Sequence, residues 1–182
     1  MLSSPEHMAH MHHTEADTAR QAASLLLGCF RWFVLASLSL AAAFKLFTVL
    51  WISHSSAPFL ASPEPVLAFL FGVPVPLGAV MLLEALGEAI VVGLLLRSDL
   101  RTQMAITAFV STLFLLYHLL LAQIGYHGPC PCFGDVYRYL GLSVPTVNAI
   151  TLCVALVMGI GSYGWFMVEW LKQRSSVPGQ RT

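Results

Sequence analysis

The sequence predicts an all-α integral membrane protein: a four-helix transmembrane bundle with a short interfacial helix in the first outer loop. Two observations lead to this fold class. The chain has 182 residues, of which 57% are hydrophobic and only 10% are charged, whereas soluble domains carry about 25% charged residues. In addition, four separate segments each offer the ~20 mostly apolar residues that a helix needs to cross a bilayer.

The four predicted spans follow one another with short connections. They cover residues 27–51, 77–96, 104–124 and 144–168. We therefore expect one membrane domain of four transmembrane helices, residues 26–170, after a disordered His/Met-rich cytoplasmic lead, residues 1–25, and before a cytoplasmic tail, residues 171–182.

The loop after the first span contains a second, shorter apolar stretch. Residues 66–71 are too few to span the membrane, and prolines stand on both sides of them. Proline begins or breaks a helix rather than continuing one, so these residues are expected to form a short helix in the membrane interface near the outer mouth of the bundle. An ordinary connecting loop is the alternative.

Lys and Arg residues predict the orientation, because they accumulate on the cytoplasmic side of membrane proteins. The loop after the first span has none, and the loop after the third span has Arg138 alone. We therefore expect a multi-pass protein of the bacterial inner membrane with both termini in the cytoplasm. The loop around Arg138 is expected in the periplasm or outside the cell. The basic residues on the cytoplasmic side would be Arg20, Arg31, Arg97, Arg101, Lys172, Arg174 and Arg181.

The loop after the third span also carries two closely spaced cysteines. Residues 128–135 read Gly-Pro-Cys-Pro-Cys-Phe-Gly-Asp, with Cys130 and Cys132 separated by one proline. On the oxidising side of a membrane, such thiols are expected to form a disulfide or to take part in exchange. The prolines favour an extended backbone, which holds the two Cα atoms near the upper limit for a disulfide and predicts a strained, labile bridge.

Two other interpretations of this loop stay open. The cysteines and prolines could brace the turn without any chemistry. They could also bind a metal together with His127 and Asp135, although a closed zinc site would need a second cysteine pair that is not nearby.

Ionisable residues inside the spans are the second group of candidate site residues, because such residues are costly in a bilayer and usually functional or paired. At a rise of ~1.5 Å per residue, Lys45, Glu84 and His118 reach about the same depth below the cysteine loop, and Glu88 lies one turn deeper than Glu84 on the same helix face. We expect a buried contact between Lys45 and Glu84. The alternative is that Lys45 extends to the outer interface and that His118 only bonds a neighbouring helix.

Two further features concern cofactors. A polar pocket below a redox-active loop would suit a quinone head group, although no residue in the sequence specifies that cofactor. Cys153, at a similar depth, is expected to be a small apolar packing residue. The lead contains weak candidate ligands for copper or nickel, which a flexible tail would also tolerate without binding any metal: His7, His10, His12 and His13.

The motif between the third and fourth spans carries a family resemblance. Cys130-Pro131-Cys132-Phe133-Gly134 in this position, together with Lys45 in the first span and a Glu in the second, resembles the MauE family of methylamine utilisation proteins within the DoxX-like group. The resemblance covers residues 30–168. It implies a role in disulfide formation or export during the maturation of a periplasmic partner. It also implies a link to methylamine metabolism, although the identity of the family's substrate does not carry over to this chain.

The expected function is therefore that of a membrane thiol–disulfide redox or maturation factor with Cys130 and Cys132 as catalytic residues. Its expected partners are the lipid bilayer and an exported disulfide-containing or thioredoxin-like protein. A nucleic-acid partner is not expected, because nine basic and nine acidic residues cancel. The alternatives are a non-enzymatic assembly factor or chaperone with a structural cysteine loop, and a metal-handling protein that uses its lead.

Overall fold

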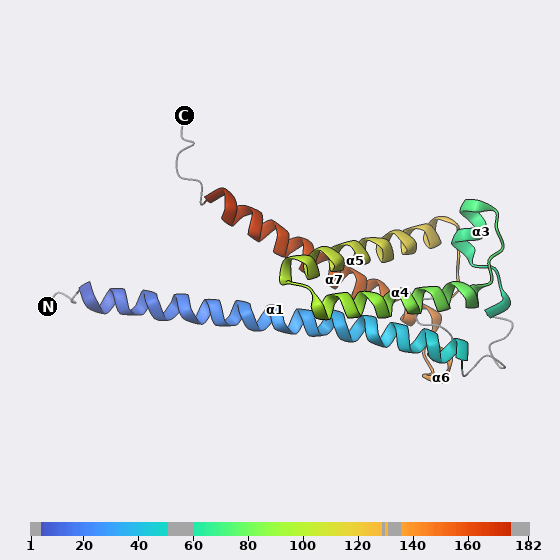
Figure 1. Cartoon of the computed structure of the whole chain (residues 1–182), viewed down its shortest axis with the longest axis horizontal. Coiled ribbons are helices and arrows are strands. Elements are labelled where there is room, and N and C mark those ends of the chain that lie inside the picture. Colours follow the sequence, from blue (N-terminus) through green and yellow to red (C-terminus); the bar gives the residue numbers. More distant parts are fainter. Residues whose placement is uncertain (1–4, 51–59, 129, 131–135, 176–182) are drawn as a thin grey trace, which may run out of the picture. The chain divides into compact units, whose positions relative to one another are not determined.

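The computed structural model describes residues 5–50, 60–128, 130 and 136–175. All regular elements within these ranges are helices (Figure 1), which confirms the predicted fold class. They are α1 (Pro5–Leu50), α3 (Pro65–Phe71), α4 (Leu77–Arg97), α5 (Leu100–Gln123), α6 (Val136–Tyr139) and α7 (Val144–Ser175).

Four of these helices are long and apolar enough to cross a membrane: α1 from Gln21 to Leu50, α4, α5, and α7 from Val144 to Arg174. Their outward faces stay apolar. Leu83 is 69% exposed, Phe109 65% and Ile160 72%. A water-soluble bundle would show polar side chains at such positions, whereas a lipid environment accepts large apolar ones. The protein is therefore a multi-pass membrane protein.

The chain divides into two units, Met1–Leu35 and Ala36–Thr182. In the first unit, α1 begins at Pro5, so the helix runs through the lead that we expected to be disordered. Two local features favour this helix. Proline is well tolerated in a first helical turn, and residues 15–23 are rich in Ala, Glu, Arg and Gln, which have high helix propensity.

In the second unit, α5 and α7 pack against each other far more extensively than α4 or α3 packs against α5. Small residues allow this close approach. Ser111 on α5 is buried opposite Gly159 on α7, where a Cβ atom would meet the Ser111 Oγ at 3.5 Å. Ala155 and Ser162 continue the buried strip along α7. Membrane helices commonly associate through such small residues, because lipid provides no hydrophobic driving force between helices.

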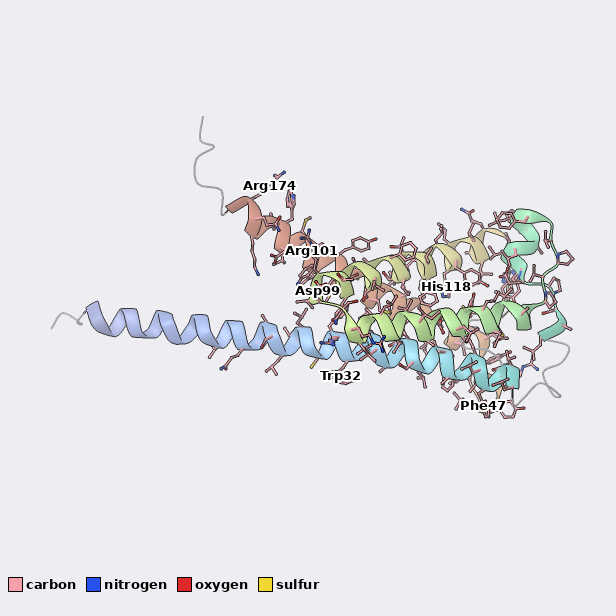
Figure 2. All side chains as sticks on the ribbon, in the orientation of Figure 1. Trp32, Phe47, Asp99, Arg101, His118 and Arg174 are labelled. Atoms are coloured by element: carbon pink, nitrogen blue, oxygen red, sulfur yellow. The ribbon has the colours of Figure 1, made fainter. Side chains whose placement is uncertain are left out.

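A tight turn joins α4 to α5, and Figure 2 labels Asp99 in this turn and Arg101 in the first turn of α5. Asp99 is the N-cap of α5: its carboxylate accepts hydrogen bonds from the backbone N–H groups of Arg101 and Thr102 and from the Thr102 hydroxyl. These bonds lower the pKa of Asp99, and the Thr102 hydroxyl makes the largest contribution. The Gln103 side-chain amide donates to the carbonyl groups of Leu95 and Ser98 and fixes the turn from the other side.

The short helix α3 lies at the opposite end of α4 (Figure 1) and confirms the prediction of a helix between the prolines. Pro65 starts it, and Gly72 ends it in the left-handed conformation (φ 66°), which favours glycine. A pair of backbone hydrogen bonds, from Glu64 to Val75 and from Leu77 to Ser62, ties the two ends of the α3 segment together. The start of α3 is thereby fixed beside the start of α4.

Candidate functional site

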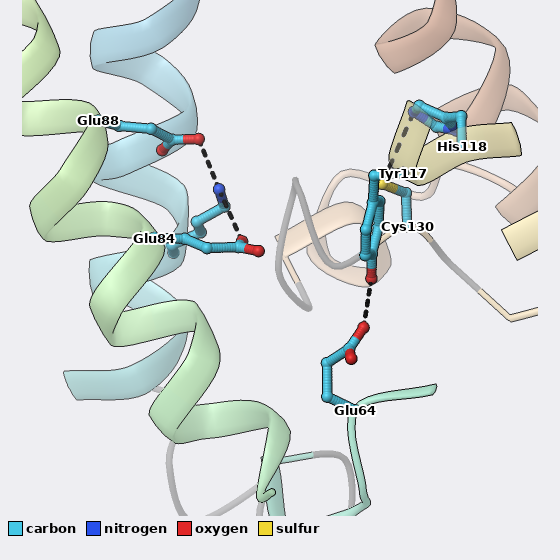
Figure 3. A network of polar contacts seen from close by, with 7 residues as sticks. Glu64, Glu84, Glu88, Tyr117, His118 and Cys130 are labelled. Atoms are coloured by element: carbon cyan, nitrogen blue, oxygen red, sulfur yellow. Dashed lines mark hydrogen bonds and ion pairs between the residues drawn. The ribbon is translucent and has the colours of Figure 1, made fainter. Parts of the chain in front are cut away.

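A buried ionic cluster occupies the interior of the second unit. The Lys45 Nζ on α1 lies 2.5 Å from Glu88 Oε1 and 3.1 Å from Glu84 Oε2, both on α4 (Figure 3). The Lys45 side chain is 0% exposed, that of Glu88 is 8% exposed and that of Glu84 is 35% exposed. The expected contact between Lys45 and Glu84 is present, and Glu88 joins it. Lys45 does not extend to the interface.

The cluster contains more acidic than basic groups. Glu84 and Glu88 are one turn apart, so both face Lys45, and two carboxylates share a single ammonium group. The ring of Phe114 lies 6.0 Å from the Lys45 Nζ and adds a weak cation–π contact. Among the described residues, nothing hydrogen-bonds the buried Oε2 of Glu88. A buried charge without full compensation is costly, so this cluster is a strong candidate for a functional group.

The ionic cluster opens into a groove of about 390 Å³ between α1, α4 and α5, which we call the α4–α5 groove. Its walls are apolar apart from the cluster and Tyr117. They are formed by Leu38, Gly87, Val91, Val110, Leu113, Phe114, Leu116 and Leu120.

The second part of the site surrounds Cys130, which is 1% exposed. Its Sγ lies 3.8 Å from the Nε2 of His118 on α5 (Figure 3). Its backbone N–H donates to the Asn148 Oδ1 on α7 at 2.8 Å, and the Asn148 amide donates to the Gly128 carbonyl at 3.3 Å. Two helices therefore hold this cysteine in place. An imidazole beside a thiol can accept its proton and produce the reactive thiolate.

Tyr126 lies near Cys130, and its ring lies beside Gly128 of the cysteine loop. Burial raises the pKa of Tyr126, and the neighbouring Cys130 acts in the same direction. A Cβ atom at Gly128 would collide with the Tyr126 ring. A larger residue at position 128 would therefore require the Tyr126 ring to move.

A further contact connects α3 to α5 near this site. The Tyr117 hydroxyl donates to Glu64 Oε1 at 2.8 Å, while Glu64 Oε2 accepts the backbone N–H of Leu67 (Figure 3). Glu64 is 2% exposed. This carboxylate therefore caps α3 and also fastens it to the helix that carries His118.

His118 also borders a second cavity, of about 170 Å³, between α1, α5 and α7, which we call the α1–α5–α7 cavity. Among the described residues, His118 is the only ionisable side chain that lines it. The remaining lining is formed by Ser37, Leu38, Leu40, Ala41, Phe114, Ile150, Thr151, Val154, Ala155 and Met158.

The predicted site residues thus fall into two groups: Lys45, Glu84 and Glu88 form the ionic cluster, and His118 contacts Cys130. Cys132 lies outside the described residues, so its pairing with Cys130 stays a prediction. Cys153, expected to pack as a small apolar residue, is instead exposed on α7, where its weakly polar thiol can face lipid.

The metal candidates gain no support from the part of the chain that the structure describes. Within it, no group of three His, Cys, Asp or Glu residues could hold a metal ion. His127 is exposed, and Asp135 lies outside the described residues. The side chains of His7, His10, His12 and His13 in α1 are outside them as well.

Sequence reasoning did not identify Glu64, Tyr117 and Asn148 as site residues. Two local signals could have found some of them. Glu64 directly precedes Pro65 and an apolar run, and because proline is common at the first position of a helix, the residue before it is a candidate N-cap. Asn148 is a polar amide one turn into an apolar span and close in sequence to the cysteine loop. Tyr117 gave no signal, because tyrosine is common near membrane interfaces.

Comparison with known proteins found no match: no family model, no curated protein and no solved structure matches this chain. The resemblance to the MauE family remains a hypothesis that rests on the quoted residues.

Proposed function

We propose that this protein is a membrane thiol–disulfide exchange protein that forms disulfides in an exported partner. The observation that carries the proposal is the 3.8 Å contact between the Cys130 Sγ and the His118 Nε2. It provides a thiol, a group that can exchange protons with it, and a fixed position, since Asn148 holds the backbone of Cys130.

The burial of Cys130 assigns different roles to the two cysteines. A partner protein cannot reach a sulfur atom whose residue is 1% exposed. In the proposed reaction, a partner thiolate therefore attacks the Cys132 sulfur of the Cys130–Cys132 disulfide, and Cys130 leaves as a thiolate beside His118. The second partner thiol then resolves the mixed disulfide. In total, two electrons and two protons pass from the partner dithiol to the cysteine pair.

The proposed location is the inner membrane of a bacterium, with both termini in the cytoplasm and the Cys-Pro-Cys loop outside it. The distribution of Lys and Arg supports this orientation. Residues 26–170 would be the membrane domain, residues 1–25 a cytoplasmic lead and residues 171–182 a cytoplasmic tail. The resemblance to the MauE family supports an exported disulfide-containing or thioredoxin-like partner and a link to methylamine metabolism.

Burial and anchoring of Cys130 also favour a second candidate, a non-enzymatic assembly factor in which the cysteines brace the outer loop. The two functions differ in one measurable property. A bracing disulfide resists reduction, whereas an exchanging one opens in a mild thiol buffer.

The test is to trap free thiols with a mass-shifting maleimide before and after titration with a glutathione redox buffer. We expect Cys130 and Cys132 to be oxidised in untreated membranes and to become reactive in mildly reducing buffer, with Cys153→Ser as the matched control. Cys130→Ser should accumulate a mixed disulfide through Cys132, whereas Cys132→Ser should not. Full labelling in untreated membranes, or complete resistance to reduction, would contradict the proposal.

His118 provides a second test of the same proposal. A general acid or base usually contributes about 10²- to 10⁴-fold to a rate, so His118→Phe should slow exchange by at least about 10²-fold. The loss should be greatest near neutral pH and should shrink at high pH, where a thiol ionises without help. An unchanged rate and pH profile in His118→Phe would argue for the bracing role.

A further inference from the structure

The α1–α5–α7 cavity is not explained by thiol exchange alone, although it ends at the histidine that contacts Cys130. We propose that this cavity binds the ring of a lipid-soluble quinone, which reoxidises the cysteine pair. This inference rests on the proposed function and names its electron acceptor.

The size and polarity of the cavity fit one six-membered ring. A dry apolar cavity of about 150 Å³ is sufficient for benzene, and this cavity measures about 170 Å³. Leu38, Val154 and Met158 form apolar walls, and the side chain of Phe114 contributes an aromatic wall.

The cavity lies within reach of the lipid. Its lining includes Leu40, which is 50% exposed, and Ile150, which is 38% exposed. Both belong to helices long and apolar enough to cross the membrane, so their exposed faces meet the acyl chains. A ligand with a long apolar tail could therefore insert its ring and leave the tail in the bilayer.

His118 supplies the specific polar contact. An imidazole N–H can donate to a quinone carbonyl, which is a hydrogen-bond acceptor. Two hydroxyl groups also line the cavity, those of Ser37 on α1 and Thr151 on α7. Thr151 already donates to the carbonyl groups of Val147 and Asn148. A pocket with mostly apolar walls and a few polar groups is typical of sites for small lipophilic ligands.

The redox balance requires such an acceptor. After the partner has been oxidised, Cys130 and Cys132 are both thiols. Formation of the Cys130–Cys132 bond breaks two S–H bonds and releases two electrons and two protons. A quinone takes up both electrons and both protons and becomes a quinol. No further reactant is needed.

The α4–α5 groove is the competing location. It is larger, about 390 Å³, but Lys45, Glu84 and Glu88 line it. A neutral ring placed there would have to remove polar partners or water from charged groups, which is costly. In the α1–α5–α7 cavity the same ring would meet one imidazole, the hydroxyl groups of Ser37 and Thr151, and apolar side chains, with no Lys, Asp or Glu among the described lining residues.

The experiment uses the full chain in detergent and a decyl-substituted benzoquinone whose ring has no free carbon for thiol addition. Ala155→Leu and Ala41→Leu each fill the α1–α5–α7 cavity, whereas Gly87→Leu is the matched control that fills the α4–α5 groove, where a Cβ atom meets nothing within 4 Å. The melting temperature of wild type and Gly87→Leu should rise with quinone concentration. At least one cavity-filling variant that melts cooperatively without quinone should lose at least tenfold in apparent affinity.

In the same assay, the quinone-dependent shift in melting temperature should depend on whether residue 118 has an N–H donor. His118→Gln retains an N–H donor and should retain part of the quinone-dependent shift, and His118→Phe should lose it. Equal shifts in wild type and all variants would show partition into the detergent and would overturn the inference, as would the absence of any shift in wild type.

A second readout separates this inference from the proposed function. Pre-reduced protein without oxygen should convert one quinone to quinol for each pair of thiols lost to maleimide. If exchange with glutathione disulfide proceeds but the quinone neither binds nor oxidises the thiols, the quinone site is wrong and the exchange function stands. If the quinone shift depends on the cavity but no exchange occurs, the quinone site stands and the exchange function is wrong.

Discussion

Tyr117 donates its hydroxyl hydrogen to Glu64 Oε1 at 2.8 Å, while the second oxygen of the same carboxylate caps α3. The two residues are 53 positions apart in the sequence. One buried side chain therefore determines where α3 begins and to which long helix it attaches. Since Tyr117 directly precedes His118, any displacement of α3 acts on the helix turn that contacts Cys130.

Tyr117→Phe should lower the free energy of unfolding by about 1–3 kcal/mol, because it leaves a buried carboxylate with one hydrogen bond fewer. Chemical denaturation in detergent measures this change. Tyr163→Phe is the matched control, since its hydroxyl bonds Thr112 on the exposed surface, and it should change stability by less than about 0.5 kcal/mol. Equal losses in the two variants would contradict the assigned role of Glu64.

The ionic cluster predicts non-additive substitutions. Lys45→Met removes the only ammonium group of the cluster and should cost about 3–5 kcal/mol, because it leaves buried carboxylates uncompensated. Glu88→Gln should cost more than Glu84→Gln, since the side chain of Glu88 is 8% exposed and that of Glu84 is 35% exposed. Unfolding in detergent should show that Lys45→Met/Glu88→Gln loses less than the sum of its single variants. Strictly additive losses would argue against the pairing.

The hydrogen bonds of Asn148 to the cysteine loop should limit how readily Cys130 reacts with a thiol reagent. Asn148→Ala removes the acceptor for the Cys130 N–H and the donor to Gly128, so the loop should loosen and pre-reduced Cys130 should react faster with a maleimide. Asn148→Asp keeps the acceptor and should give a smaller increase. The measurement is the rate of labelling in a Cys132→Ser background, where Cys153 provides an internal reference. An unchanged rate in Asn148→Ala would mean that Asn148 does not restrain the cysteine.

Asp99 predicts a pH-dependent part of the stability. Because hydrogen bonds lower the pKa of Asp99 in the folded protein, its stabilising contribution is present above the ordinary aspartate value of 3.8 and is lost as the pH falls through the lower folded value. The melting temperature of wild type should therefore approach that of Asp99→Asn on acidification from pH 7. Asn also caps helices well, so the difference between the two curves reports the titration. A difference in melting temperature between the two proteins that stays constant from pH 7 to below pH 3.8 would contradict the prediction.

The topology yields an independent prediction. A reporter that fluoresces only in the cytoplasm should give signal when fused to the C-terminus and no signal when inserted at Gly128. The reason is that Lys and Arg concentrate on one side of the bundle, with Arg138 alone on the other. The reverse pattern of fluorescence would require an inverted protein, with the cysteine loop in the reducing cytoplasm.

Most of the fold follows from hydropathy, because each span must satisfy its backbone hydrogen bonds within a helix and must present apolar side chains to lipid. The short helix α3 was equally predictable, since prolines and Gly72 mark its ends. The extent of α1 was not. Residues 15–23 have favourable helix propensity, but the sequence of the lead shows no apolar periodicity that would indicate a buried helix face.

The site could be predicted only where chemistry restricts the choices. A lysine and two glutamates within spans have few alternatives to pairing, so their contact was foreseeable from depth and helix period. The contacts of His118 with Cys130, Asn148 with the loop and Tyr117 with Glu64 depend on the rotation of each helix about its axis. Hydropathy does not specify this rotation when every face of a span is apolar.

The burial of Lys45 has a consequence for biosynthesis. Glu88 is 43 positions later in the chain, so the ribosome completes α1 before either glutamate of α4 exists. At that stage an unpaired ammonium group inside the span raises the free energy of insertion, by up to about 2.5–3.5 kcal/mol for a charge at a helix centre and by less for Lys45, which lies nearer the end of its span. The first helix is therefore expected to wait at the insertion machinery until α4 arrives, and the two helices should enter the lipid as a pair.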